Sequence, residues 1–382
     1  MKQLNLHKDV KYWVNEAIDF SSLSLNHLYG WVDFNDVNNA YKNLYAHAIG
    51  HNLKYAYNKN LDSIHTKTTE LEFKNGVLYI YPKQATTYQS NLGKSWIKID
   101  FTQDEELLTF ILLFDGKLDP DTLGILEEFK IKIPFLQNTG KTKVNLNLSV
   151  NLRTIAINAK GVFFTKKANF KYHGYDIDIF NAKIELDNYD VRIKKMQAKY
   201  KDIISTEIDV LYNAQKNEGI LDFRLSKIDI DKSTLKLHPQ KKYLKATYKI
   251  NPTKDFLTIN KSYWQFKEHN IELGKISLPL DLEKLELEIQ KTKIYSKTLL
   301  NADISGKIDL KKLKAELDLN LKNVYFGGIE LSKKKNAIKI KYDKSLNIQT
   351  KNILEFTLNS EKSFLNPTSI ELKNNHLILS ET

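Results

Sequence analysis

The strongest constraint on the fold is a run of strict alternation in residues 141–152, which read KTKVNLNLSVNL. Apolar side chains at every second position share one face of an extended strand, with asparagine and serine on the other face. The candidate lining residues of this apolar face are Val144, Leu146, Leu148, Val150 and Leu152. A strand of about nine residues needs partners of similar length and a cover for its apolar face. A closed sandwich, a barrel and an open groove that holds an apolar ligand all meet this need.

The same alternation recurs along the rest of the chain up to residue 382, with a strand about every 12 to 15 residues and roughly 25 strands in all. On the same pattern, further lining residues are expected at Ile177, Ile179, Leu313, Leu317 and Leu319. A sheet of more than about ten strands must curl, split or close. We therefore expect a mainly β protein built from an elongated, twisted and curled antiparallel sheet. Stacked strands would give it a length on the order of 100 Å.

The segment before residue 141 adds two short helices to this expectation. Apolar residues at helical spacing predict an amphipathic helix near 8–18, packed on the first strands. Asp119 followed by Pro120 is a typical helix start and predicts a short helix near 119–129. The pair Asn75-Gly76 between two apolar runs predicts a hairpin, whereas Leu107–Phe114 lacks alternation and reads either as a strand buried on both faces or as a short helical piece.

The chain shows no clear domain boundary. Gly and Pro are scarce, at 14 and 7 residues, so composition does not mark a linker. We divide the sequence into an N-terminal module, 1–140, and a continuous long-stranded part, 141–382, which together are expected to form one elongated body.

The charge pattern argues against nucleic acid as a partner. The formal net charge is +12, yet only three of the 58 basic residues are arginine, the side chain preferred for bidentate contacts to bases and phosphates. The lysine excess fits either a general bias in composition or attraction to an anionic membrane surface and its lipid head groups.

Several functional classes are excluded or disfavoured by what the sequence contains. There is no Cys, so thiolate metal sites and Cys nucleophiles are excluded. The longest apolar run, 107–114, is far shorter than the roughly 20 residues that cross a bilayer, so we expect no transmembrane segment in this chain. His47 and His51 have the spacing of a helical zinc motif, but Ala48 replaces its glutamate. The carboxylates at 104–106 read as a solvated acidic edge. We therefore predict a non-enzyme with no catalytic residue, metal or cofactor.

Three stretches resemble the AsmA-like proteins of Gram-negative envelopes, in particular the YhdP and TamB branch with its repeating β-groove. Residues 11–36 are similar to the family's Trp-containing helix followed by a glycine and an Asp-Phe pair, here Trp13, Gly30, Asp33 and Phe34. Residues 71–82 are similar to its strand-turn-strand, and 133–152 resemble the segment that leads into its long strands. The resemblance covers roughly residues 8–230.

The resemblance implies a sheet folded like a taco, a β-groove whose apolar inside carries phospholipid acyl chains through the periplasm between the inner and outer membranes. Full-length relatives are anchored in the inner membrane, and the missing anchor and shorter length imply a fragment or truncated member. The expected function is lipid binding and transfer that supports outer-membrane integrity, with phospholipid and a membrane surface or envelope proteins as partners. The alternative is a non-catalytic structural or assembly protein of the envelope with a closed β-sandwich core.

Overall fold

The computed structural model describes most of the chain. The described residues are 18–56, 60–88, 90–103, 105–128, 135–172, 174–231, 235–237, 243–266, 269–281, 286–298, 300–309, 312, 314–326, 329–331, 336–343, 345–358, 361–373 and 376–381. The protein is mainly β, as predicted, and its chain forms two compact units that meet between Met196 and Gln197, within strand β14.

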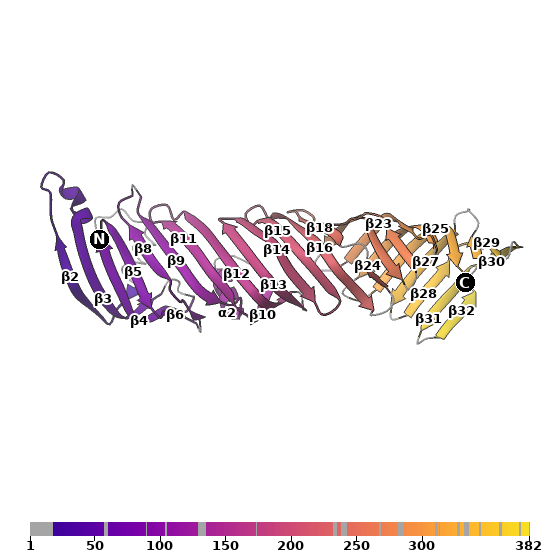
Figure 1. The fold of residues 1–382 in the computed structure, drawn as a ribbon, viewed down its shortest axis with the longest axis horizontal. Coiled ribbons are helices and arrows are strands. Elements are labelled where there is room, and N and C mark those ends of the chain that lie inside the picture. The colour runs from indigo at the N-terminus through magenta and orange to yellow at the C-terminus, as the bar shows by residue number, and fades with distance from the viewer. Residues whose placement is uncertain are drawn as a thin grey trace. The chain divides into compact units, whose positions relative to one another are not determined.

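Unit 1 is a sheet of long antiparallel strands (Figure 1). Its strands are β1 (Ile18–Asp19), β2 (Ser22–Gly30), β3 (Leu44–Tyr55), β4 (Ile64–Lys74), β5 (Val77–Lys83), β6 (Thr86–Thr87), β7 (Ser90–Asn91), β8 (Trp96–Asp100), β9 (Leu107–Gly116), β10 (Phe135–Gly140), β11 (Thr142–Asn151), β12 (Ile157–Tyr172), β13 (Tyr175–Asp187) and β14 (Asp190–Tyr200).

Neighbours in this sheet are almost always neighbours in the sequence. The order across it is β2-β3-β4-β5-β8-β9-β11-β12-β13. The short strands β1, β6 and β10 extend the same sheet beyond the ends of β2, β5 and β11 by pairing with β3, β4 and β12. Unit 1 is therefore a meander of hairpins, in which each strand pairs mainly with the strands that precede and follow it in the sequence.

Two helices interrupt unit 1. The 3-10 helix η1 (Val37–Asn43) connects β2 to β3, and α2 (Pro120–Glu128) connects β9 to β10. The predicted helix start at Asp119 is confirmed, since its carboxylate accepts the backbone N–H of Thr122 at 2.9 Å. The predicted hairpin is confirmed as well: Asn75 and Gly76 both have positive φ, +51° and +71°, and join β4 to β5.

The predicted helix near 8–18 falls mostly outside the described residues, and its last residue, Ile18, lies in strand β1. Leu107–Phe114 is a strand, β9, so the helical alternative was wrong. In the part of the chain that the structure describes, no helix is long and apolar enough to span a bilayer.

Unit 2 begins with strands that pair in the same sequential manner. They are β15 (Ile204–Asn213), β16 (Glu218–Asp231), β17 (Leu235–Leu237), β18 (Leu244–Ile250), β19 (Phe256–Ile259), β20 (Ser262–Phe266), β21 (His269–Leu273), β22 (Ile276–Asp281), β23 (Glu286–Tyr295), β24 (Leu300–Asp309) and β25 (Lys314–Phe326). The last strands are β26 (Ile329–Leu331), β27 (Asn336–Asp343), β28 (Ser345–Thr350), β29 (Leu354–Leu358), β30 (Glu361–Leu365), β31 (Thr368–Lys373) and β32 (His376–Glu381).

In unit 2 the sheet divides into two ribbons and rejoins. One half of β16 pairs with β18 and the other half with β17. The ribbons β18-β19-β22 and β17-β20-β21 then meet again on the single strand β23. Beyond β25 the sheet divides once more, into β27-β28-β31-β32 and β26-β29-β30. At each division a long strand pairs with two shorter strands in place of one long strand. The structure therefore has more strands, numbered up to β32, than the roughly 25 expected.

Candidate functional site

The predicted apolar face of β11 continues across unit 1 in register. Leu148 lies opposite Phe110 of β9, and the same row passes through Ile97 and Ile80 to Leu71 and Ala48 of β3. A second row, one step along the strands, joins Val150, Leu108, Ile99, Leu78 and Phe73. The face that carries these rows is here named the apolar face. The opposite, polar face carries Asn147, Lys98 and Glu72.

The large side chains of the apolar face are incompletely covered. Ala48 is 7% exposed, but Leu71, Ile80, Ile97, Phe110 and Leu148 are only half-buried. Full burial is confined to small clusters, such as Ile99, Leu108 and Leu152 at one edge of the face. In a dry two-sheet core, side chains of this size interdigitate with a facing layer and lose their contact with solvent. The apolar face of unit 1 therefore keeps apolar surface that other molecules can reach.

The predicted lining residues fall into three groups. Val144, Leu146, Leu148 and Val150 share the apolar face of β11, and Leu152, 3% exposed, packs just past its end. Ile177 and Ile179 lie on β13 opposite Phe170 and Ala168, toward the other end of the long strands. Leu317 and Leu319 belong to β25 of unit 2, where Leu319 is buried with Ala302 and Ile304. Leu313 lies outside the described residues.

A crease runs across unit 1 at mid-strand, and the sequence alone did not predict it. On several strands two consecutive outward residues interrupt the alternation, each pair flanked by residues that face inward. In β12, Lys166 and Lys167 are exposed between buried Thr165 and Ala168. The same pattern occurs at Asn52, Lys67, Gln84 and Asn181.

These interruptions are aligned between neighbouring strands. Asn52 of β3 falls between the pairs Leu53–Thr66 and His51–Thr68, directly opposite Lys67 of β4. Asn181 of β13 likewise lies opposite Lys166 of β12. Asn52 and Asn181 have φ of +50° and +51°, and the break between β10 and β11 falls at Gly140 with φ +85°. The strand register is the same on both sides of these breaks, so one residue leaves the ladder on each of two facing strands. The aligned breaks mark one line across the sheet, and after each break the apolar residues continue on the same face.

Small hydroxyl side chains occupy the floor of the crease, and several of them form hydrogen bonds at the strand breaks. Thr66 donates to the carbonyl oxygen of Lys83 at 2.6 Å. Ser95 accepts the N–H of Leu113 at 2.9 Å, and Thr142 and Thr165 share a hydrogen bond of 2.8 Å. Thr69 differs, because it is fully buried and its hydroxyl has no partner among the described residues. The floor of the crease is therefore polar, with hydrogen-bonded hydroxyls at Thr66, Ser95, Thr142 and Thr165 and an unpaired one at Thr69.

Ion pairs brace the sheet at its polar edges. The guanidinium of Arg153 binds the carboxylate of Glu106 at 2.8 and 3.1 Å, joining the turn after β11 to the start of β9. This hydrogen bond lowers the pKa of Glu106 against the opposing effect of burial. The expectation of a solvated acidic edge was therefore wrong for Glu106, which is 7% exposed. Arg224 similarly forms ion pairs with Glu207 and Asp209 in unit 2. Two of the three arginines therefore hold neighbouring parts of the fold together.

The residues considered for metal binding lie in a strand and not in a helix. His47 of β3 contacts Glu70 at 3.1 Å, and His51 pairs in register with Thr68. Among the described residues, no group of three or more potential metal ligands comes together.

The comparisons add no relative: the chain matches no protein-family model, no curated protein and no solved structure.

Proposed function

We propose that the protein is a lipid-binding and transfer module, in which the apolar face and its crease hold phospholipid acyl chains. The observation that carries the proposal is the continuous row from Ala48 to Leu148, which is apolar on six successive strands and whose five large side chains are incompletely covered. At about 4.8 Å per strand the row is about 24 Å long. One leaflet of a bilayer core is about 15 Å thick, so the row is long enough for an extended acyl chain.

The β2 end of unit 1 supports an entry point for lipid. The leucines of β2 continue the apolar rows beyond Ala48, yet Leu23, Leu25 and Leu28 are 57 to 59% exposed. The connection that follows exposes Trp31 and Phe34, and Phe34 is 90% exposed. Figure 1 shows this connection projecting beyond the ends of the neighbouring strands. Aromatic and aliphatic side chains in such a position suit contact with a membrane surface.

The cellular setting is part of the same proposal and rests on the resemblance described above. We place the module in the periplasm of a Gram-negative envelope, where it would move phospholipid between the inner and outer membranes and support outer-membrane integrity. No catalytic step is required of it.

A charge placed on the apolar face tests the proposal. Leu148→Asp interrupts the row between Phe110 of β9 and Ala159 of β12. On an open face the carboxylate stays hydrated, so we expect near-native circular dichroism and melting, together with loss of co-purified lipid and of transfer between vesicles. The matched control is Asn147→Asp, which adds the same charge on the polar face and should change neither property.

Other outcomes would contradict the proposal. If the wild-type protein carries no lipid after gentle purification and Leu148→Asp unfolds it, the face is a dry core and the alternative of a closed structural protein holds. If Leu148→Asp folds and carries lipid normally, the row does not hold the acyl chains.

A further inference from the structure

Lysines gather on the polar side of the crease. The outward positions at the strand interruptions are exposed, and in unit 1 many of them are lysine: Lys67, Lys83, Lys94, Lys141, Lys166 and Lys167. These six residues, here named the lysine row, lie on or beside five strands, β4, β5, β8, β11 and β12, while β9 between β8 and β11 contributes none. At about 4.8 Å per strand they span about 24 Å across the strands. The row has two halves, offset along the strand direction, since Gly93 faces Leu113 while Thr142 faces Gly116 of the same strand.

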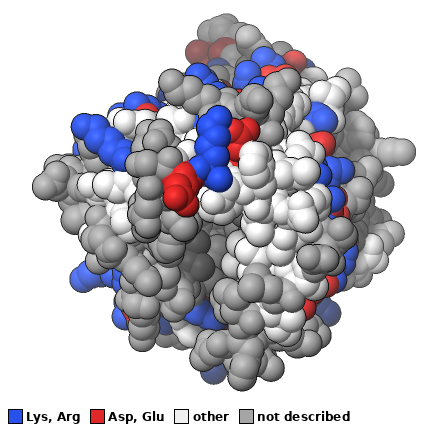
Figure 2. All heavy atoms as spheres, turned by 90° about the vertical axis from the view of Figure 1, so that its right-hand side faces the viewer, with Lys and Arg blue, Asp and Glu red and all other residues white. Residues whose placement is uncertain are grey.

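The lysine row carries little compensating charge. Lys83 has one carboxylate nearby, Glu70 at 3.7 Å. No carboxylate of a described residue lies within ion-pair distance of Lys67, Lys94 or Lys166. Lysines at equivalent breaks of unit 2 are paired instead: Lys261 with Glu272 at 2.6 Å, Lys322 with Asp303 at 3.1 Å and Lys351 with Asp318 at 2.5 Å. Figure 2 shows basic and acidic side chains side by side on the end of unit 2 that faces the viewer.

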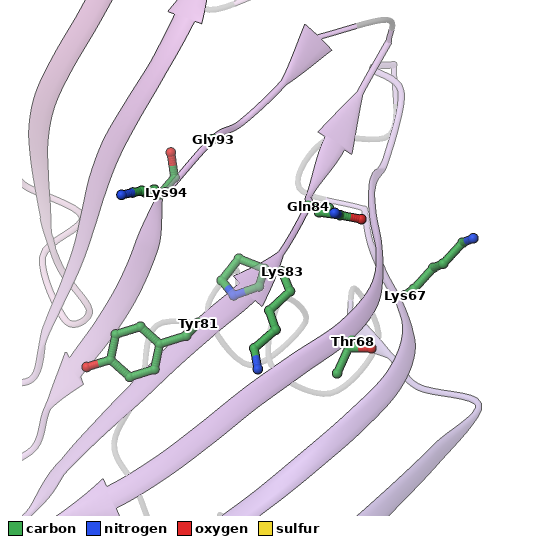
Figure 3. Close-up of a pocket in the computed structure, with 9 residues that line it drawn as sticks. Lys67, Thr68, Tyr81, Lys83, Gln84, Gly93 and Lys94 are labelled. Atoms are coloured by element: carbon green, nitrogen blue, oxygen red, sulfur yellow. The ribbon is translucent and has the colours of Figure 1, made fainter.

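A pocket lies in the first half of the row. It has a volume of about 670 Å³ and is lined by Lys67, Lys83 and Lys94 together with Thr68, Tyr81 and Gly93. Figure 3 shows Lys83 between Tyr81 and Thr68, with Lys67 and Lys94 on the flanking strands. Tyr81 also contacts Trp96 with tilted rings, whose centroids are 5.8 Å apart, which places an indole beside the pocket. The row therefore borders an open hollow at Lys83, while the side chains of Lys67 and Lys94 point to opposite sides of it (Figure 3).

We propose that the lysine row of unit 1 binds a linear polyanion, a chain of closely spaced phosphate or carboxylate groups, with one group seated in the pocket. The proposal rests on the complementarity between the positive charge of the lysine row and an anionic ligand. The elongated shape of the row favours a linear ligand. The row is one or two side chains wide and hollowed at one end, so a chain can follow it, whereas a flat bilayer cannot enter the pocket. A lysine ammonium group is a compact point charge and lacks the planar, bidentate geometry of an arginine guanidinium. The site would therefore recognise the spacing of the negative charges along the ligand and not the shape of each anionic group. The proposal is independent of lipid binding on the opposite face.

The experiment measures the affinity of the full chain for long-chain inorganic polyphosphate, and for a polyuronate, over a series of salt concentrations. The two probes distinguish a phosphate source from a carboxylate source. Two triple variants remove the halves of the row: K67Q/K83Q/K94Q and K141Q/K166Q/K167Q. Each lost contact should lower the slope of log affinity against log salt by about one, so each variant should lose about two to three units of slope. Binding of polyphosphate near Trp96 should also change the tryptophan fluorescence.

The matched control is K216Q/K249Q/K293Q, which removes the same net charge at exposed positions of unit 2, outside the row. We expect it to keep at least two thirds of the wild-type slope, with all three variants melting at the wild-type temperature. Equal losses in all three variants would overturn the proposal in favour of net charge alone. Loss only in the first triple, with pyrophosphate bound as tightly as polyphosphate, would show a compact anion pocket and overturn the extended site. Binding of anionic vesicles that depends on the row, without polyphosphate binding, would replace the polyanion by a membrane.

Discussion

At the scale of single residues, the floor of the crease contains two buried threonines in opposite situations. The hydroxyl of Thr66 donates to the backbone carbonyl of Lys83, whereas the hydroxyl of Thr69 is buried without a partner among the described residues. A buried polar group lowers stability when it lacks a hydrogen bond and raises it modestly when it has one.

The same substitution should therefore have opposite signs at these two positions. We expect Thr66→Val to lower the free energy of unfolding by about 1 to 3 kcal/mol, because it removes the buried hydrogen bond to the carbonyl of Lys83. Thr69→Val should raise the free energy of unfolding by about 1 kcal/mol, because it removes an unsatisfied hydroxyl at nearly constant volume. Urea denaturation of both variants checks the pair, and equal effects would contradict the hydrogen-bond assignment.

The Glu106–Arg153 pair gives a pH dependence with a definite sign. The folded-state pKa of Glu106 is lowered, chiefly by its hydrogen bond to Arg153. Its contribution to stability is therefore complete above the unfolded-state pKa of about 4.3 and is lost as pH falls through the lower, folded-state pKa. Arg153→Met should cost about 1 to 3 kcal/mol at pH 7, since the guanidinium is partly exposed, and the difference from wild type should shrink below about pH 4. A difference that grows on acidification would contradict the pairing.

At the scale of strands, two glycines show what the breaks require. Gly140 joins β10 to β11 with φ +85°, and a Cβ there would lie 2.4 Å from the carbonyl oxygen of Lys167. Gly124 in α2 has nothing within 4 Å of an added Cβ. We expect Gly140→Ala to destabilise by at least about 2 kcal/mol and Gly124→Ala to stabilise by about 0.5 to 1 kcal/mol. Thermal melts of the two variants make the comparison, and a harmless Gly140→Ala would place the break elsewhere.

The strands and one lining group could be predicted from the sequence, but the crease could not. Val144 to Val150 alternate without interruption, so their shared face follows from strand geometry alone. At Lys166-Lys167 the alternation shifts by one residue, which reads in the sequence as the end of one strand and the start of another. The shift in alternation at Lys166-Lys167 can be recognised as a break within one strand only because Asn181 of the next strand shows a shift at the same level. The alignment of two strands depends on long-range pairing, which the local sequence pattern does not reveal. Glu106 was misjudged for a similar reason, because its partner Arg153 is 47 residues away.

At the scale of the whole molecule, the net charge of +12 acts on any large anionic surface. Association with anionic vesicles should weaken steeply between low and physiological salt, because the Debye length shortens and exposed lysines are screened. Both lysine-row variants and the control triple should weaken it to a similar extent, since each removes three charges. Co-sedimentation at two salt concentrations measures this. If binding to anionic vesicles does not depend on salt, the lysine excess reflects a general bias in amino-acid composition and not attraction to a membrane.

The meander of unit 1 also bears on how such a protein can change in length. Because each strand pairs mainly with its sequence neighbours and each row repeats from strand to strand, a hairpin is a self-contained building block. Duplicating or deleting one hairpin, such as β12–β13, would lengthen or shorten the crease by about 10 Å and leave every remaining strand in its direction. A single strand could not be added in this way, because the chain would re-enter the sheet from the wrong side. Homologous proteins of this architecture should therefore differ in length by whole hairpins, in steps of roughly 25 to 30 residues.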